Sequence, residues 1–392
     1  MKKIIVIGDT SSTNLGDPIL THSCKYIVEK VAAGQDYSIV EFDIADRLQT
    51  KVVTPTEPTP IPMGKKPSRI AHIKTGIVND VKAIIKWLTK DKTAFRTKLL
   101  NVGVPNGCTF VIAGGALISD SLFYALRLNE IVKIAKACNG RVVFNAVGIE
   151  KSIYNMGLAK YVVRHYLKQK EVVAFSTRDH VEDVPYISNR KEFCKQIPDS
   201  GLFAAEAYGI ARKESDTIGL SVISFNAYRS VMQNDERAAK MTPDDLLMFW
   251  ESILKQFIAE GTPFKILTNG AAADYNLALH LCNRMNLPVQ QYLLPLAKTP
   301  QQLIEQLSTF KVVIAHRLHA LIVSTSLGIP VIPVVWSDKV SVFANMIDNP
   351  NAVWPTTQKS KVVSSAVRNN LLSKECVNHI KEQSIEYINS NI

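Results

Sequence analysis

Residues 311–335 read KVVIAHRLHALIVSTSLGIPVIPVV and contain the repeating unit from which this chain is built. The apolar run KVVIA comes first, an amphipathic pattern follows over 318–328, and a second apolar run, PVIPVV, ends at residue 335. Continuous apolar runs separated by a helical pattern are typical of parallel strands that helices cover on both faces. The stretch therefore predicts a strand–helix–strand unit of an α/β protein.

The same alternation recurs over most of the chain. Further strands are predicted at 2–8, 37–44, 109–115, 141–149, 171–177, 217–224, 264–270 and 289–294. Helices are predicted between or after them, at about 18–31, 128–138, 157–169, 243–261, 276–285 and 300–310. The pattern predicts two doubly wound, Rossmann-like domains that face each other across a cleft, a GT-B-like α/β architecture.

The polar stretch ARKESDT, at 211–217, interrupts the alternation and predicts the domain boundary. We expect an N-terminal domain over 1–210 and a C-terminal domain over 211–372. The remaining residues, 373–392, have a helical pattern, and this helix could pack back across the hinge. Ligands of such sheets bind beyond the carboxyl ends of the strands, so the site is expected in the cleft.

Composition excludes several classes of protein. The chain has 392 residues, 46% hydrophobic and 21% charged, which is ordinary for a globular protein and not for a disordered or fibrous one. No apolar stretch reaches the roughly 18 residues of a spanning helix, and the N-terminal residues lack a signal-peptide pattern. Six cysteines without metal-ligand spacing predict reduced thiols, a cytoplasmic protein and no metal site.

Positive charge is concentrated in one segment. The net charge of the chain is +11, and residues 65–98 hold ten basic residues against Asp80 and Asp91. Apolar residues recur there at three- and four-residue steps, which predicts an amphipathic helix. The helix either packs on its own domain with solvated lysines or lies on an anionic membrane surface. Nucleic acid is disfavoured because no base-reading motif is present, and the proline-rich stretch 54–67 predicts an exposed loop.

The strongest candidate site lies in the opening stretch. The predicted strand brings His316, Arg317 and His319 to its carboxyl end, where the next helix begins. Residues two apart in an extended loop point the same way, so Arg317 and His319 can share a pocket, and Lys339 can return to it. A guanidinium binds phosphate or carboxylate, a histidine titrates near neutral pH, and a helix N-terminus attracts anions. An unpaired Arg317 beside an apolar strand would be costly, which favours a site for an anionic substrate over a structural role.

Two other strand ends carry weaker signals. In the loop GDTSSTNLGD, at 8–17, Asn14 could shape the turn and Asp17 cap the helix, or both could line the cleft with Asp17 accepting a sugar hydroxyl. Gly114 and Gly115 end another strand, where the backbone turns or approaches a ligand closely.

A third strand end is AFSTRDHVED, at 174–183. Ser176 and Arg178 leave this strand toward the predicted cleft. The alternative is a surface arginine that pairs with Asp179.

Together these motifs resemble the polysaccharide pyruvyl transferase family, from about residue 4 to residue 345. The family's markers are an N-x-G-D loop, a glycine-rich strand end, S-x-R-D, R-x-H-A, G-I-P-V-I and a lysine. They stand here as Asn14-Leu15-Gly16-Asp17, Gly114-Gly115-Ala116, Ser176-Thr177-Arg178-Asp179, Arg317-Leu318-His319-Ala320, Gly328-Ile329-Pro330-Val331-Ile332 and Lys339. Ala116 replaces a third glycine, and Trp336 stands where tyrosine is usual.

The resemblance implies transfer of the pyruvyl group of phosphoenolpyruvate onto a sugar of a bacterial surface polysaccharide, such as a capsule or exopolysaccharide, or of its lipid-linked precursor. The product would be a ketal and the leaving group phosphate, with phosphoenolpyruvate as co-substrate and no cofactor or metal. The C-terminal domain would bind this donor and the N-terminal domain the sugar acceptor. The implied residues are His319 as general acid/base, Arg317 in catalysis and donor binding, Arg178, Lys339 and His316 in donor binding, and Asn14, Asp17, Gly114 and Gly115 on the acceptor side.

Two other functions fit the same architecture. A GT-B glycosyltransferase would use a nucleotide-sugar donor and would need a pocket for the nucleobase. A non-catalytic protein that binds glycans or lipid phosphates would tolerate loss of His319. If the acceptor is carried on a lipid diphosphate, the basic segment 65–98 would hold the protein at the anionic inner membrane.

Overall fold

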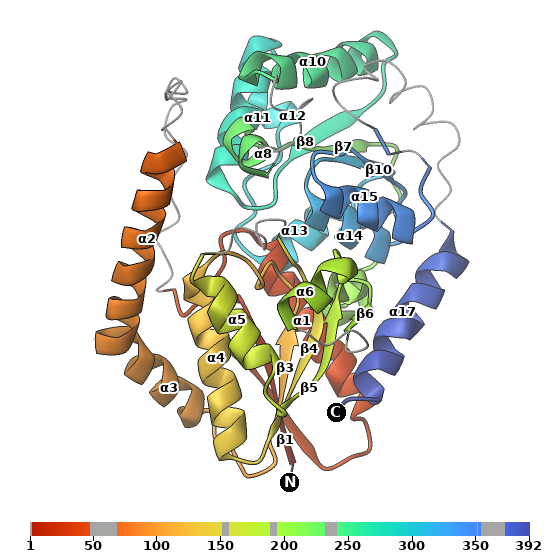
Figure 1. The fold of residues 1–392 in the computed structure, drawn as a ribbon. Helices are drawn as coiled ribbons and strands as arrows, with labels where there is room; N and C mark the ends of the chain where they lie inside the picture. Colours follow the sequence, from red (N-terminus) through yellow and green to blue (C-terminus); the bar gives the residue numbers. More distant parts are fainter. Residues whose placement is uncertain are drawn as a thin grey trace.

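Two parallel β-sheets, one above the other in Figure 1, form the framework of the protein. The computed structural model describes residues 2–47, 69–150, 157–188, 194–231, 241–350, 352–353 and 373–392. The predicted loop at 54–67 and the first residues of the basic segment lie outside the described residues. The last strand of the first sheet ends at Gln196 and the first strand of the second begins at Ile218, so the sheets lie on either side of residue 211.

The N-terminal sheet has six strands in the order β2-β1-β3-β4-β5-β6. Their bounds are β1 (Lys2–Gly8), β2 (Tyr37–Asp43), β3 (Thr109–Ala113), β4 (Arg141–Val147), β5 (Val172–Thr177) and β6 (Cys194–Gln196). The sequence predicts the first five, whereas β6 is too short and polar to produce a strand pattern. Helices cover both faces of this sheet, which explains why its four inner strands, β1, β3, β4 and β5, are mostly apolar and buried.

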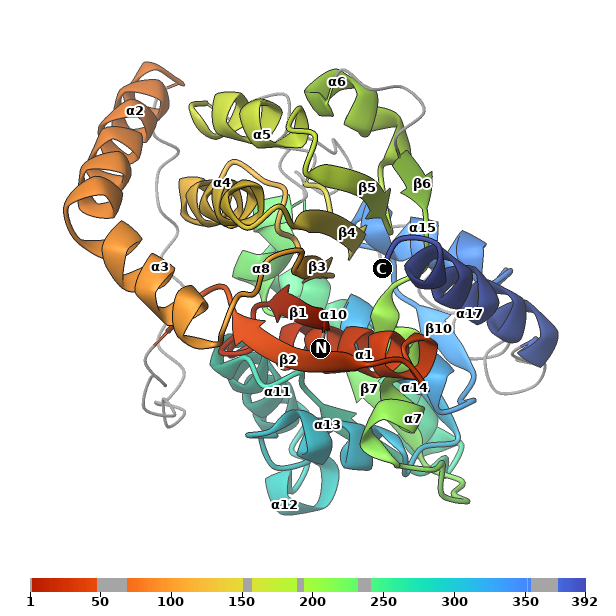
Figure 2. The ribbon, with the colours of Figure 1, turned by 90° about the horizontal axis from the view of Figure 1, so that it is seen from below.

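Figure 2 shows the two helical layers. One face carries α3 (Lys92–Asn101), α4 (Leu122–Ala137) and α5 (Ala159–Leu167), and the other carries α1 (Gly16–Val31) and α17 (Lys374–Asn389). Helix α4 begins at Leu122, earlier than its predicted start at 128. Helix α2 (Arg69–Lys86) and a π-helical segment (Trp87–Asp91) precede α3 and form the predicted amphipathic helix. Short helical segments over Val181–Asp183, α6 (Val184–Ser188), η4 (Ser200–Phe203) and α7 (Ala204–Tyr208) complete this half.

The C-terminal sheet has four strands in the order β10-β9-β7-β8. They are β7 (Ile218–Ser221), β8 (Phe264–Leu267), β9 (Val312–Ala315) and β10 (Val331–Pro333). The helices of this half are α8 (Phe225–Val231), α10 (Pro243–Ala259), α11 (Ala272–Arg284), α13 (Pro300–Leu307), α14 (Leu318–Ser326) and α15 (Asp338–Met346). Helix α10 begins with a capping box between Thr242 and Asp245, in agreement with its predicted acidic first turn.

The strand predicted at 289–294 is wrong. Residues Val289–Tyr292 form a helical turn, α12, directly after Pro288, and only Leu293 makes a bridge to the sheet, at Ile266. The apolar side chains of Val289 and Tyr292 stand three residues apart, so one turn of helix places both against the core.

The two halves are packed against each other through helix α14. A Cβ on Gly201 of η4 would lie 2.9 Å from side-chain carbons of both Ile322 and Leu20, so α14, η4 and α1 meet without space for a side chain at residue 201. Helix α17 returns to the N-terminal half, where the Tyr387 hydroxyl donates to the carbonyl oxygen of Phe144 at 2.8 Å. Among the described residues, no helix is long and apolar enough to cross a membrane.

Candidate active site

Strand order places the candidate residues between the two sheets. In the N-terminal sheet β2 is added on one side of β1 and β3 on the other side, so the topological switch point lies between β1 and β3. In the C-terminal sheet the switch point lies between β7 and β9 in the same way. Loops after such strands diverge and leave a crevice at their carboxyl ends. The loop of Asn14 follows β1, Gly114 follows β3 and Arg317 follows β9, so tertiary structure brings together motifs that are far apart in the sequence.

The side chain of His319 contacts the loop that follows β1. It lies in the first turn of α14 and is 8% exposed. A Cβ on Gly16 would lie 1.8 Å from His319 Nδ1, so only glycine allows this contact. The Nδ2 atom of Asn14 lies 3.4 Å from His319 Nδ1 and also 3.4 Å from Asp17 Oδ2. The N-x-G-D loop thus forms the surface that holds the imidazole.

The surroundings of His319 favour its neutral form. Its pKa is lowered well below the ordinary value, first by burial and then by the charges of Arg178, Arg317 and Lys339. An amide donor at Nδ1 leaves the ring proton on Nε2. Among the described residues Nε2 is buried without a hydrogen-bond partner. The ring therefore presents an unused polar atom within the field of three cations.

Asp17 is a second group of the site whose pKa is shifted, in this case toward neutrality. Its carboxylate accepts a hydrogen bond from Ser12 Oγ at 2.8 Å. Burial raises the pKa of Asp17 to about 6, and the nearby charge of Asp9 adds to this shift, whereas the Ser12 hydrogen bond opposes it. Helix α1 begins at Gly16 and has no side-chain cap, so Asp17 is not the helix cap.

Of the two glycines after β3, Gly114 lies against Leu20 and Gly115 faces Asp17. Gly114 has φ +31° and Gly115 φ +74°, a conformation that other residues rarely adopt. A Cβ on Gly115 would lie 3.7 Å from Asp17 Oδ1. The positive φ values confirm the turn that the sequence predicted as one of two alternatives, and this turn keeps the backbone of Gly115 close to the carboxylate of Asp17.

Arg317 is held by a carboxylate that sequence analysis missed. Its Nε and Nη2 donate to the two oxygens of Asp274 at 2.7 and 2.9 Å. Asp274 is fully buried and also accepts from the backbone N–H of Ser224 at 2.8 Å. Asp274 lies in the first turn of the helix after β8, and an acid at this place is the signal that could have identified it.

Arg178 is also paired, and it is not a surface residue. Only 7% of it is exposed, and it forms ion pairs with Asp199 and, at 3.7 Å between Nε and Oδ2, with Asp179. A Cβ on Gly148 would lie 3.1 Å from Arg178 Nη2, so this backbone lies directly on the guanidinium.

Ser176 does not face the cleft. It is fully buried, donates to the carbonyl oxygen of Phe144 at 3.1 Å and accepts from the N–H of Ala146 at 2.9 Å. Ala146 has φ +50°, so Ser176 supports an irregular turn within β4.

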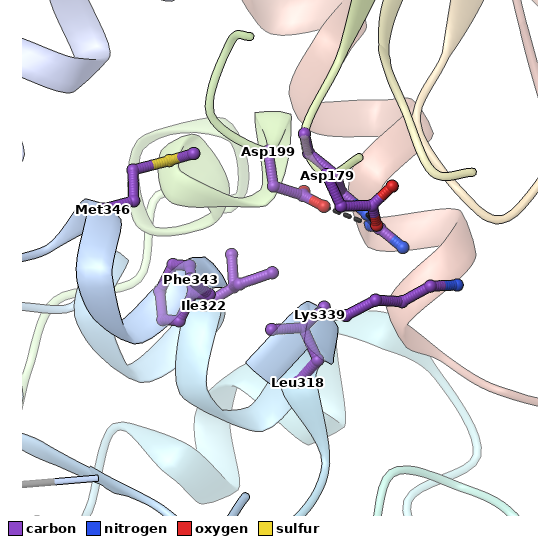
Figure 3. A pocket seen from close by; sticks show the side chains of 8 residues that line it. Asp179, Asp199, Leu318, Ile322, Lys339, Phe343 and Met346 are labelled. Carbon is purple, nitrogen blue, oxygen red and sulfur yellow. Dashed lines mark hydrogen bonds and ion pairs between the residues drawn. The ribbon is translucent and has the colours of Figure 1, made fainter. Parts of the chain in front are cut away.

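A pocket between the halves brings Arg178 and Lys339 together, whereas Arg317 and His319 are not among its walls (Figure 3). Its walls are Arg178, Asp179 and Asp199 from the N-terminal half and Leu318, Ile322, Lys339, Phe343 and Met346 from the C-terminal half. The cavity volume is about 10 Å³, enough for about one water molecule. The charge of Lys339 acts on the half-buried Glu150: desolvation raises the pKa of this carboxyl group, and Lys339 opposes the shift. Carboxylates therefore fix the positions of Arg178 and Arg317, whereas Lys339 interacts with Glu150 through its charge alone.

His316 does not reach this pocket, which corrects its prediction as a donor contact. The side chain is fully buried, with ring centroids of Trp250, Phe249 and Tyr228 at 5.1, 5.9 and 6.2 Å. Burial, together with the charge of Arg317, lowers its pKa to about 3. Successive residues of an extended segment point to opposite sides, so His316 enters the core while Arg317 turns toward Asp274.

This burial predicts an acid-sensitive fold. Below about pH 6.5 the unfolded chain binds a proton that folded His316 does not bind, so the free energy of unfolding falls as pH falls. In His316→Phe, the loss of unfolding free energy between pH 7 and pH 5 should be smaller by about 2 kcal/mol than in the parent protein. Denaturant unfolding at the two pH values measures it, with His280→Phe at an exposed position as the control. An identical loss in His316→Phe and the parent would contradict the prediction.

One group of side chains has metal-ligand spacing within the described part of the chain. Ligand atoms of His180, Glu182 and Asp183 lie within 4.8 Å of one another. His180 Nδ1 and Glu182 Oε1 are 3.3 Å apart and satisfy each other, and Glu182 is exposed. The cluster is separate from the pocket around Lys339.

Solved structures with the same architecture confirm the GT-B fold. UDP-GlcNAc 2-epimerase from Methanocaldococcus jannaschii has a TM-score of 0.50 and 10% identity, covering 98% of this chain and 99% of its own. A structure described as trehalose-6-phosphate from E. coli bound with UDP-2-fluoro glucose has a TM-score of 0.52 and 9% identity, covering 99% and 97%. At these identities the likeness concerns the fold alone. No curated protein matches the chain.

A family model described as polysaccharide pyruvyl transferase matches residues 14–338. The match starts at Asn14 and includes Arg178, Arg317 and His319, and it ends one residue before Lys339. It covers far more than half of the chain and agrees with the motifs that the sequence displays. The chain belongs to the polysaccharide pyruvyl transferase family.

Proposed function

We propose that this protein transfers the pyruvyl group of phosphoenolpyruvate to two hydroxyls of a sugar, forms a cyclic ketal and releases phosphate. The sugar would belong to a bacterial surface polysaccharide or to its lipid-linked precursor. One observation carries the proposal: the charges of three nearby cations act on the imidazole of His319, and Asn14 links this imidazole to the carboxylate of Asp17. An acid–base pair beside fixed cations suits a small, highly charged enol ester.

The paired cations would bind the donor. Arg317 uses Nε and Nη2 on Asp274, so its Nη1 hydrogens are left for the donor carboxylate or phosphate. Lys339 on the opposite side of the pocket from Asp179 would contact the phosphate, and Arg178 would add a buried positive charge. Because carboxylates already hold the guanidinium groups in place, little reorganisation is needed when the donor binds.

The chemistry requires a proton on the methylene carbon and the removal of protons from two hydroxyls. Protonated His319 gives its proton to the methylene carbon, and the adjacent carbon becomes an oxocarbenium ion. The first sugar hydroxyl adds to this carbon and loses its proton to Asp17. The second hydroxyl displaces phosphate and returns a proton to His319, and Asp17 passes its proton to the departing phosphate. The products are the ketal and hydrogen phosphate, so all atoms and charges balance without a metal or an organic cofactor.

The lowered pKa of His319 fits this cycle only with donor bound. In the free protein, burial and the three cations disfavour the imidazolium form. The negative charges of phosphoenolpyruvate would offset these cations and raise the pKa, so donor binding would protonate the ring. The acid would then be charged only in the complex in which it is needed.

The narrow pocket implies movement of the two halves. A cavity of about 10 Å³ cannot hold phosphoenolpyruvate, so the halves would separate for the donor to enter. Reclosure would exclude water, which would otherwise convert the oxocarbenium ion to pyruvate.

Ligand-induced stabilisation tests the donor. Phosphoenolpyruvate at 100 times its Kd should raise the free energy of unfolding by about 2.7 kcal/mol, seen as a higher melting temperature. UDP and UDP-glucose should have no effect, and phosphate or pyruvate alone serve as controls for the two halves of the donor. Stabilisation by the uridine nucleotides without any by phosphoenolpyruvate would contradict the proposal and favour a nucleotide-sugar glycosyltransferase.

A further inference from the structure

Helix α2, taken here together with the π-helical segment Trp87–Asp91 that continues it, carries an apolar stripe that is exposed in the described structure. Its members are Val78, Val81, Ile85 and Leu88, with exposed fractions of 51%, 45%, 55% and 63%. Steps of three, four and three residues place them on one face of the helix. The packing of α2 on its own domain uses other side chains, namely Ala83, Ile84 and Trp87. The stripe is therefore not the face that attaches the helix to the protein.

A row of lysines borders this stripe. Lys82, Lys86 and Lys90 are all exposed and follow one another at four-residue steps. Lys86 has Asp91 at 3.4 Å as its partner, but the segment 65–98 as a whole holds ten basic residues and only two acidic ones. Both ribbon views place α2 at the outer edge of the N-terminal half, beyond α4 and α5 (Figures 1 and 2).

We propose that α2 docks the protein on a bilayer surface with anionic head groups. Interfacial helices place an apolar face at the boundary of head groups and acyl chains, while lysines beside it contact the lipid charges. The stripe and the lysine row provide both features on one exposed helix.

A second copy of the chain fits this surface poorly. Dimerisation through the stripe would bring two lysine rows together on chains that each have a net charge of +11. Four half-exposed side chains also provide far less than the roughly 800 Å² per partner that a stable interface buries.

The proposal goes beyond the transfer reaction, because docking requires neither donor nor acceptor. It also assigns the transfer reaction a location, the membrane surface. Helix α2 belongs to the half that carries Asn14 and Asp17, so a sugar held on a membrane lipid would approach the predicted acceptor side.

Co-sedimentation with vesicles tests the docking surface. The full chain should bind vesicles of phosphatidylglycerol and phosphatidylcholine, should not bind phosphatidylcholine alone, and should bind less as salt rises. The variant Lys82→Glu/Lys86→Glu/Lys90→Glu should bind about 100-fold more weakly. The variant Val81→Ser/Ile85→Ser changes no charge and should also weaken binding, which separates the apolar contribution from the electrostatic one.

The matched control changes the same amount of charge elsewhere. Lys133, Lys136 and Lys168 are exposed on α4 and after α5, and their replacement by glutamate should leave most of the binding intact. Equal losses in the control and in the α2 lysine variant, or unchanged binding in either α2 variant, would overturn the proposal. A dimer formed through the stripe would also overturn it. In that case the parent chain would not bind vesicles, and sedimentation equilibrium would show a dimer that dissociates in the Val81→Ser/Ile85→Ser variant. Failure of docking would leave the response to phosphoenolpyruvate unaffected, so the two proposals fail separately.

Discussion

His319→Ala should reduce acceptor-dependent release of phosphate from phosphoenolpyruvate by about 10²- to 10⁴-fold, the usual contribution of a positioned acid–base group. The physical reason is the place of the ring: it touches Gly16 and Asn14 on one side and is subject to the charges of Arg178, Arg317 and Lys339. No other histidine of the described structure has these neighbours. The measurement is steady-state phosphate release with methyl hexosides that have free 4- and 6-hydroxyls as acceptors.

Two controls separate chemistry from folding. His280→Ala, at an exposed position on α11, should retain full activity. The melting temperature of His319→Ala should stay near that of the parent, because within the described part of the chain the ring makes a single, long hydrogen-bond contact, to Asn14. Near-normal turnover in His319→Ala would refute the assigned role. If the parent protein showed no turnover and His319→Ala bound glycan as tightly as the parent, a non-catalytic glycan-binding protein would be favoured.

Arg317→Lys should lower kcat/KM for phosphoenolpyruvate by about 100-fold, although it keeps the positive charge. The guanidinium of Arg317 is fixed by two parallel hydrogen bonds to Asp274, at 2.7 and 2.9 Å, and would bind the donor through its remaining hydrogens. A lysine ammonium cannot make the fork and the donor contact in one geometry. Loss of one charge-assisted hydrogen bond corresponds to about 2–3 kcal/mol, which gives this factor.

Asp274→Asn tests whether the pair acts as a unit. Asp274 contacts no substrate in the proposed reaction and positions Arg317, so the asparagine variant should raise KM for phosphoenolpyruvate more than it lowers kcat. The double variant should lose less than the product of the two single losses, because both disrupt the same contact. Arg284→Lys, at another paired arginine of this half, is the control for a general effect on ion pairs. Full additivity of the Arg317 and Asp274 variants would contradict the positioning role.

Local patterns predicted most elements because each depends on residues that are close in the chain. The strand–helix–strand unit predicted at 311–335 is observed as β9, α14 and β10, almost at the predicted bounds. The acidic first turn predicted for α10 is also observed. Where local patterns were ambiguous, tertiary contacts decided. The run at 289–294 is apolar enough for a strand, yet beyond the edge strand β8 it forms a helical turn whose side chains reach the core.

The amino-acid sequence by itself determined the α/β class, the order of the elements and the motif that contains Arg317 and His319, since periodicity and residue type are local properties. Only the tertiary structure decided which partners these residues have. Asn14 and His319 are 305 positions apart in the chain, yet their side chains are in contact. Arg317 pairs with Asp274, and His316 packs among aromatic side chains of the core. These contacts depend on how two sheets are stacked and at which strands each reverses, and no periodicity along the chain records that arrangement.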